Sequence, residues 1–163
     1  MVDSGQNLCY YVYIIQKRYE TMLMLTGEYN HQLDAKNRIR IPAKLKKELG
    51  DDYYFTRGTN GCIAVMPKSM VDKKLEVLMS TVKDGDLEKQ KGLRMYAKSF
   101  VAGEEDNQGR VVLNSKLKAY ANIKKDVVIC GAITRIEIWA KEEYDKYFAD
   151  DVNFDEMFAK LDI

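Results

Sequence analysis

The sequence predicts an α+β protein built from two copies of one supersecondary unit. A motif of an aspartate, three turn-forming residues and an arginine occurs at residues 34–38 and again at 106–110, an offset of 72 residues. Each copy precedes a short apolar run and the start of a helix, and Gly58 aligns with Gly131 further on. Such a repeat indicates pseudo-symmetry. Because each unit is too small to close a core alone, the halves are expected to complete one another.

The first half is expected to open with two short strands joined by a tight turn. The strands are predicted at residues 25–33 and 38–41. The turn is predicted at 34–37, because Asp and Asn side chains bond to nearby backbone and tolerate unusual dihedrals. Alternation along the second strand places Arg38 and Arg40 on one face, which is expected to point outward.

A short helix and a hairpin are expected to complete the first half. The helix is predicted at residues 42–50, with a proline in the first position and a glycine at the end. The pair Asn60-Gly61 lies between apolar runs at 53–56 and 62–66, which is a strong signal for a β-hairpin.

Two amphipathic helices are expected at residues 68–80 and 87–100, with the hinge between the halves at 83–86. The second half then repeats the plan, with a strand at 111–113, a helix at 115–121, a hairpin from 127–130 and 136–139, and a helical stretch at 141–161. The expected division of the chain is an N-terminal extension at 1–23, a first half at 24–83, a connecting helix at 84–100, a second half at 101–148 and a tail at 149–163.

Residues 1–21 fit poorly with the repeated plan. The run 10–15 is apolar but lacks the alternation of a half-buried strand, and its flanks are not those of a signal peptide. One hypothesis is that translation begins at Met22 or Met24, since residues 17–19 could be encoded by a purine-rich tract resembling a ribosome-binding site. The alternative is a genuine extra strand or arm.

Composition indicates an ordinary globular protein, with 46% hydrophobic residues in a chain of 163. No apolar run approaches the ~20 residues needed to span a membrane. Three widely separated cysteines suggest neither a disulfide framework nor a zinc site. A reducing cytoplasm is therefore the simplest setting, and no membrane partner is expected.

The charges are unevenly distributed, although the chain as a whole carries only +1. Residues 34–48 contain six basic and two acidic side chains, whereas 137–163 contain nine acidic and three basic ones. This asymmetry suggests a basic face on a molecule with an acidic end. The alternative is two ordinary solvated faces.

The sequence offers little for enzyme chemistry. His31 is the only histidine and lies in a predicted strand, where a structural role is expected. The acidic run 104–106 could bind a cation, although a solvated loop is the simpler interpretation. Cys62 and Cys130 fall in predicted strands as small core residues. We therefore expect no catalytic residues, no cofactor and no metal ion.

The repeated motif has a structural and a functional interpretation. In the first, an Asp–Arg pair pins a turn. In the second, Asp34 and Asp106 organise the turns so that Arg38 and Arg110 point outward, where arginine suits the paired acceptors of guanine in the major groove. Nearby cations would then contact phosphates and set the register, namely Lys36, Arg40, Lys44, Lys46 and Lys47.

The chain resembles the MraZ family. The resemblance rests on residues 24–31, 33–39 and 42–44, on the second motif at 106–110 and on the strand at 136–139. It covers nearly everything from Met24 onward, and two motifs at this spacing make it specific. Residues 1–21 lie outside it.

The resemblance implies a bacterial transcriptional regulator of the division and cell-wall gene cluster, most simply a repressor. It implies two AbrB-like swapped-hairpin βαββ halves that form a pseudo-two-fold, β-barrel-like core with external helices. It also implies a ring-shaped homo-oligomer, expected to be an octamer, that binds short G-rich direct repeats in double-stranded promoter DNA. Arg38 and Arg110 would contact the DNA, with Asp34 and Asp106 as turn organisers.

The two copies of the motif are not electrostatically equal. The second copy replaces three cations of the first with neutral residues, which are Gln108, Val112 and Ala119. We therefore expect Arg38→Ala to cost more DNA affinity than Arg110→Ala. The alternative function is an antitoxin-like or other protein-interaction module, whose acidic and aromatic C-terminal stretch grips a partner.

Overall fold

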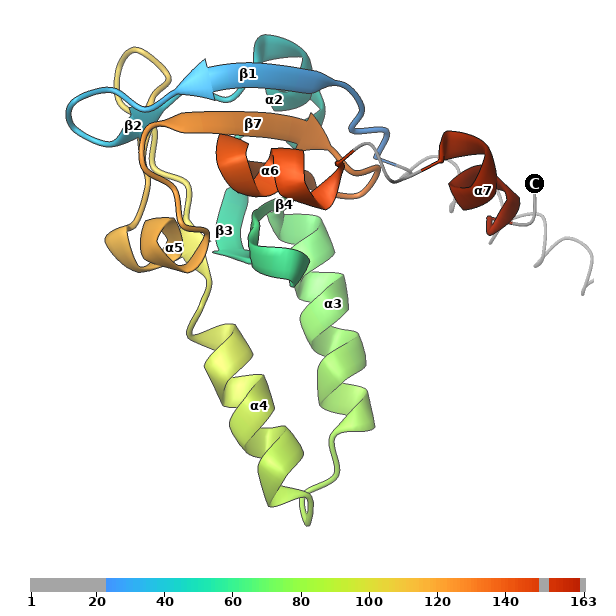
Figure 1. The fold of residues 1–163 in the computed structure, drawn as a ribbon. Helices are drawn as coiled ribbons and strands as arrows, with labels where there is room; N and C mark the ends of the chain where they lie inside the picture. The colour runs from blue at the N-terminus through green and yellow to red at the C-terminus, as the bar shows by residue number, and fades with distance from the viewer. Residues whose placement is uncertain (1–22, 150–152, 162–163) are drawn as a thin grey trace, which may run out of the picture.

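The computed structural model describes residues 23–149 and 153–161, in which strands and helices alternate as an α+β fold (Figure 1). The expectations for residues 10–15 and for the start of translation at Met22 concern residues outside this description. The strands are β1 (Glu28–Gln32), β2 (Arg38–Ile39), β3 (Tyr53–Arg57), β4 (Ile63–Pro67), β5 (Val101–Ala102), β6 (Val111–Val112), β7 (Asp126–Gly131) and β8 (Ile136–Ala140).

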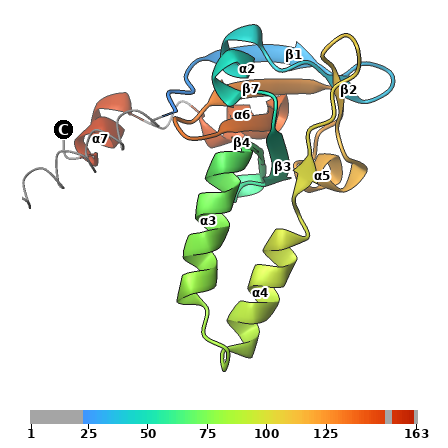
Figure 2. The same cartoon turned by 180° about the vertical axis from the view of Figure 1, so that it is seen from behind.

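The helices lie around the sheet, and two of them project from it as an arm (Figures 1 and 2). None of the described helices is long and apolar enough to cross a bilayer. They are α2 (Ala43–Leu49), α3 (Lys68–Thr81), α4 (Leu87–Ala97), α5 (Ser115–Tyr120), α6 (Lys141–Tyr147) and α7 (Phe154–Ala159), with a short 3-10 turn, η1 (Thr59–Gly61). The arm is the pair α3 and α4.

The two halves exchange their first strands. The sheet order is β1-β7-β8-β4-β3-β5, so β1 adds to the second hairpin and β5 adds to the first. Tyr29 thereby lies opposite Ile129, and Val101 lies opposite Phe55. A separate antiparallel ribbon joins β2 to β6. The six strands form an open sheet in the described part of the chain, with β1 and β5 as its edges.

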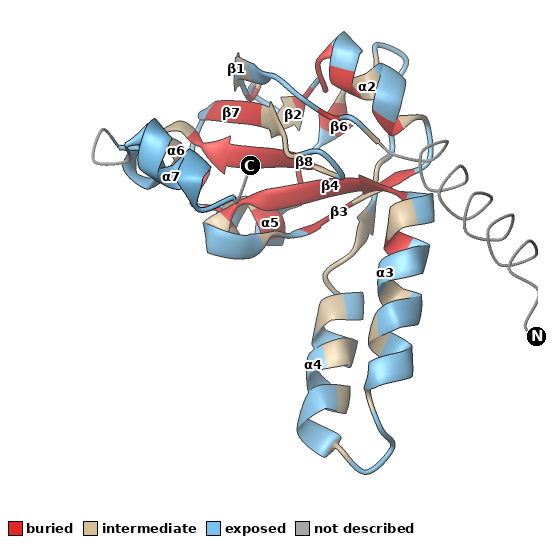
Figure 3. Cartoon of the chain, turned by 90° about the vertical axis from the view of Figure 1, so that its right-hand side faces the viewer, coloured by how far each residue is buried: buried red, intermediate tan, exposed pale blue. Residues whose placement is uncertain are grey.

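One hydrophobic core draws on both halves. Buried side chains of the first half, such as Ile39 and Leu45, belong to the same cluster as Val111 and Leu117 of the second. The central strands β4 and β8 are buried along their whole length, which explains their nearly continuous apolar sequences. Figure 3 shows burial concentrated in the sheet, whereas the arm and α7 are largely exposed. The expectation that the halves complete one another is confirmed.

Three elements differ most from the sequence prediction. The strand predicted at 25–33 is only β1, because Gly27 takes a φ of +99° and interrupts the extended backbone. Leu25 instead forms an isolated bridge to Ile133. The helix predicted at 87–100 ends at Ala97, and the stretch predicted at 141–161 contains two helices, α6 and α7. Both hairpins were predicted correctly.

Candidate nucleic-acid interface

The first turn is closed by the aspartate that begins it. The backbone amides of Lys36 and Arg38 both donate to Asp34 Oδ1 at 2.9 Å, and Arg38 Nε donates to Asp34 Oδ2 at 2.7 Å. The Asn37 amide donates to the Asp34 carbonyl at 2.9 Å, and Asn37 has a φ of 57°. Asparagine tolerates this left-handed conformation. The choice of Asp and Asn thus accounts for the shape of the turn.

The second turn repeats these bonds almost atom for atom. The amides of Gln108 and Arg110 donate to Asp106 Oδ1 at 2.9 and 3.0 Å, and Arg110 Nε donates to Asp106 Oδ2 at 2.9 Å. Here Gly109 has the positive φ, 70°. The two segments have only the aspartate and the arginine in common, yet they form the same turn. This agrees with the repeat predicted from the sequence.

The two turns meet and their four charged side chains form one cluster, which we call the Asp/Arg cluster (Asp34, Arg38, Asp106 and Arg110). Arg38 Nη1 lies 3.5 Å from Asp106 Oδ2, and Arg110 Nη1 lies 4.0 Å from Asp34 Oδ2. The antiparallel pairing of β2 with β6 brings the turns together (Figure 3). The cluster therefore exists only because residues from both halves meet.

The guanidinium groups are held beside carboxylates. The Arg38 and Arg110 side chains are 22% and 29% exposed, so neither projects freely into solvent as the outward-pointing interpretation expected. The reason is that the turn-closing aspartates also accept from the arginine side chains. The bonds are those of an Asp–Arg pair that pins a turn, and part of each guanidinium still reaches the surface.

The aspartates remain ionised in this arrangement. The amide hydrogen bond from Arg38 lowers the pKa of Asp34 below its ordinary value of 3.8, and that from Arg110 does the same for Asp106. Side-chain hydrogen bonds from the same arginines act in the same direction. Two carboxylates and two guanidiniums thus balance one another within the Asp/Arg cluster.

The other predicted DNA-contact residues differ in their exposure and in their bonds to other residues. Lys36 and Lys44 are exposed, on the first turn and on α2 respectively. Arg40 is exposed and donates to the Gln108 carbonyl of the second turn. Lys46 is tied down, because its Nζ lies 2.7 Å from Asp51 Oδ1. We call Lys36, Arg40 and Lys44, the exposed cations in the first turn and in the segment that follows it, the basic rim.

Lys46 has a structural role and is not free to act as the phosphate contact that the sequence predicted. Its Nζ also lies 3.2 Å from Glu105 Oε1, and Glu105 accepts a 2.6 Å hydrogen bond from the Tyr53 hydroxyl. Those bonds hold Glu105, which precedes the second turn, against the first half. Lys46 and Glu105 are thus structural, and Glu105 belongs to neither a free acidic loop nor a cation site.

One basic residue near the turns was missed by the sequence analysis. Lys118 of α5 donates from Nζ to Asn37 Oδ1 at 2.7 Å, which brings a cation of the second half onto the first turn. The helix that carries it is capped by Asn114, whose side chain accepts from the amides of Lys116 and Leu117. The lysine next to Leu117 was visible in the sequence, but its contact spans 81 residues.

The histidine and the two described cysteines are at least half-buried. His31 is half-buried in β1. Burial raises the pKa of the Cys62 thiol to about 12 and that of Cys130 to about 11. Cys62 is a buried core residue, as predicted, whereas Cys130 is half-buried. Within residues 23–149 and 153–161, no three His, Cys, Asp or Glu side chains gather as metal ligands would.

Comparison with known proteins agrees with the repeat. A family model described as "MraZ protein, putative antitoxin-like" matches residues 24–78 and 102–162. The Transcriptional regulator MraZ of Clostridium beijerinckii is 38% identical over 145 residues, covering 85% of this chain and 96% of that protein. The protein of the same name from Thermoanaerobacter pseudethanolicus is 39% identical over 147 residues, covering 85% and 97%. The chain belongs to the MraZ family.

Proposed function

We propose that this protein is a transcription regulator that binds double-stranded DNA through the turns at residues 34–38 and 106–110. The observation that carries the proposal is the pair of matching turns, which present two arginines together at one end of the molecule. Relatives that cover most of the chain are named transcriptional regulators. The basic rim beside the first turn suits a phosphate backbone.

A preorganised arginine is well suited to reading a base edge. Asp34 fixes the Nε edge of Arg38, so the side chain loses little conformational freedom on binding. Arginine has five N–H donors, and the bonds to Asp34 and Asp106 use two of them. The remaining Nη hydrogens would reach the paired acceptors of guanine once a duplex approaches the turn. In this view the aspartate orients the arginine and does not block it.

The charges beside the turns support a stronger role for the first turn. Arg110 directs both Nε and Nη2 to Asp106 Oδ2, each at 2.9 Å. Arg38 is bonded to Asp34 through Nε and also donates from Nη1 to Asp106 Oδ2 at 3.5 Å. Carboxylates therefore engage both arginines to a similar extent. The difference between the turns lies in the basic rim of the first half, whose second-half counterparts Gln108, Val112 and Lys116 include a single cation.

The test is a binding titration on the gene's own upstream region. Arg38→Ala should weaken specific binding by about 1–3 kcal/mol, which is the discrimination of one good bidentate base contact. Arg110→Ala should cost less. Arg94→Ala is a matched control, because this exposed arginine of α4 belongs to the arm and not to the turns. Equal losses at the two motif arginines, or a larger loss at Arg110, would overturn the asymmetry.

The finer proposals concern the target and the assembly. We propose that the sites are short G-rich direct repeats in the promoter of the division and cell-wall cluster, and that binding represses transcription. The halves would be AbrB-like swapped hairpins, and the chains would form a ring, an octamer, in the cytoplasm at the nucleoid. Several protomers on successive repeats would gain effective concentration, so a nearly neutral chain could bind DNA tightly. No catalytic step is part of this proposal.

A second candidate is a protein-interaction module. Aromatic side chains gather at the acidic C-terminal end, where Trp139 packs on Tyr147 at 5.0 Å and on Phe148 at 6.2 Å. Tyr147 and Phe148 are about half exposed, which favours contact with another protein. A gel shift on the upstream region, compared with co-purification of a stoichiometric partner, distinguishes the two functions.

A further inference from the structure

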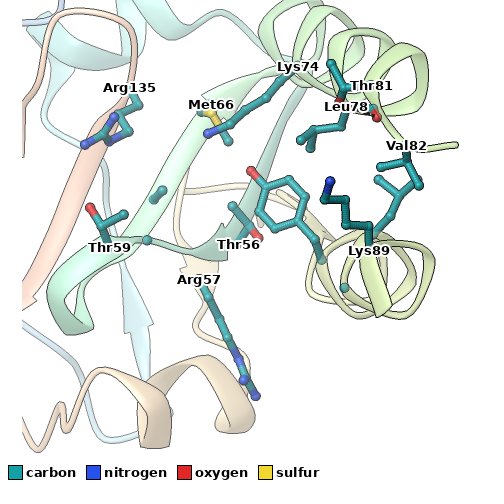
Figure 4. A pocket seen from close by; sticks show the side chains of 15 residues that line it. Thr56, Arg57, Thr59, Met66, Lys74, Leu78, Thr81, Val82, Lys89 and Arg135 are labelled. Atoms are coloured by element: carbon teal, nitrogen blue, oxygen red, sulfur yellow. Dashed lines mark hydrogen bonds between the residues drawn. The ribbon is translucent and has the colours of Figure 1, made fainter. Parts of the chain in front are cut away.

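An open groove lies between the arm and the sheet. A cavity of about 540 Å³ lies between α3, α4 and the β3–β4 hairpin (Figure 4), a volume typical of binding sites. Apolar side chains make up much of its wall, namely Ala64, Met66, Leu78, Val82 and Leu93. We call it the arm groove.

The arm groove is positively charged. Figure 4 shows the amino groups of Lys74 and Lys89 directed toward its interior, one from each helix of the arm. Lys74 lies over the Tyr96 ring at 5.7 Å and forms no ion pair with a described residue, whereas Lys89 lies 3.2 Å from Asp86. No aspartate or glutamate lines the groove in the described part of the chain. It therefore suits an occupant with apolar and acidic side chains.

Helix α7 has these properties and is itself uncovered. Its apolar side chains Phe154, Met157 and Phe158 follow the spacing of one helical face and are 44–73% exposed. Leu161, just beyond the helix, continues this spacing and is 64% exposed. Asp155 and Glu156 lie in its first turn. A six-residue helix is marginal on its own, so packing of this face would stabilise it.

We propose that α7 of one copy docks into the arm groove of a second copy. The apolar face of α7 would cover Leu78 and Leu93, with its two carboxylates near Lys74 and Lys89. Figures 1 and 2 show α7 well away from the arm of its own chain. Each copy thus offers one helix and one groove, which is a heterologous contact that closes into a ring when the rotation permits. The inference rests on the self-association in the proposed function and not on DNA binding.

The test measures association of the full chain by sedimentation velocity without DNA. A helix variant, Phe154→Ala with Phe158→Ala, and a groove variant, Lys74→Glu, should each weaken association at least about tenfold, as expected for central interface residues. Lys73→Glu is the matched control and should associate like the wild type, because this exposed neighbour does not line the groove.

A mixture of the two variants makes the test specific. The helix variant keeps an intact groove and the groove variant keeps an intact helix, so the mixture should form one-to-one dimers at concentrations where each variant alone is monomeric. Absence of these dimers, normal assembly of either variant, or an equal defect in Lys73→Glu overturns the proposal. So does a monomeric wild type, which would place α7 in its own groove or leave it free.

The outcome is separable from that of the DNA proposal. Arg38→Ala should assemble like the wild type, because the Asp/Arg cluster is not part of the arm groove. Assembly that survives both α7 and groove variants but is lost when residues 1–22 are removed would assign the contact to that extension, which also overturns the docking of α7.

Discussion

Gly131 is the point where the start of the described chain packs most closely against β7. A Cβ at this position would lie 2.3 Å from the Leu25 carbonyl carbon and from the Thr26 nitrogen. These are backbone atoms, so the segment itself has to move. That movement would disturb the bridge in which Leu25 and Ile133 exchange hydrogen bonds of 3.0 and 2.9 Å. It would also uncover the Leu25 side chain, which is fully buried.

The expected cost of Gly131→Ala follows from these contacts. Each of the two hydrogen bonds contributes about 1 kcal/mol net, and burial of a leucine contributes about 1.5–3 kcal/mol. Complete detachment of the segment would therefore cost about 4 kcal/mol, whereas an overpacked site that relaxes in part costs about 1–3 kcal/mol. We expect a loss of about 3 kcal/mol and a fall in Tm of roughly 6–12 °C for a chain of this size.

Thermal or urea unfolding followed by the fluorescence of the single tryptophan, Trp139, measures this loss. Gly92→Ala is the matched control, because this exposed glycine lies inside α4 and a Cβ there would meet nothing within 4 Å. Alanine should stabilise that helix by about 0.5–1 kcal/mol. If Gly131→Ala unfolds like the wild type while Gly92→Ala shows its gain, residues 23–27 do not pack on β7 as described.

Three further predictions concern pH and one buried pair. The Arg38 amide lowers the pKa of Asp34 below 3.8, so the stability that this carboxylate contributes is present above that pH and is lost as the pH falls through the lower folded-state pKa; Asp34→Asn should flatten this acid loss in urea titrations. Burial raises the pKa of Cys62 from 9.0 to about 12, so the unfolded chain loses its thiol proton first and stability should fall as the pH rises from 9.0 toward 12. The fall should be smaller in Cys62→Ala but still present, because burial also raises the pKa of Cys130, to about 11. Trp139→Phe removes the 3.1 Å hydrogen bond from Nε1 to the buried Glu137, and circular dichroism should record a loss of about 1–2 kcal/mol.

Local patterns in the sequence predicted the local structure well. The Asn60-Gly61 pair between two apolar runs correctly predicted the β3–β4 hairpin. The repeated motif correctly predicted two equivalent turns. Each of these features depends on residues only a few positions apart, so short-range periodicity and turn chemistry are sufficient to predict them.

Contacts between residues far apart in the chain were much harder to predict from the sequence. The sequence indicated that the halves complete one another, but nothing local specified that β1 would pair with β7 across almost a hundred residues. The same limit affected the charges. Lys46 added to the positive count of residues 34–48, but its partner Glu105 arrives from the second half. Likewise, Arg38 was placed on an outward strand face before Asp106 was known to lie beside it.

Because the charges of the Asp/Arg cluster nearly cancel, the cluster and the basic rim are expected to have different roles in DNA binding. Two carboxylates offset two guanidiniums at distances of 2.7–4.0 Å, so the cluster as a unit attracts a polyanion only weakly. Long-range attraction to DNA would then come from the basic rim, Lys36, Arg40 and Lys44, through release of counterions from the phosphates. Arg38 and Arg110 would act only at contact distance, where the unused N–H groups meet base edges. Loss of a rim lysine should therefore weaken binding to every sequence alike, whereas loss of Arg38 should chiefly narrow the difference between the operator and unrelated DNA.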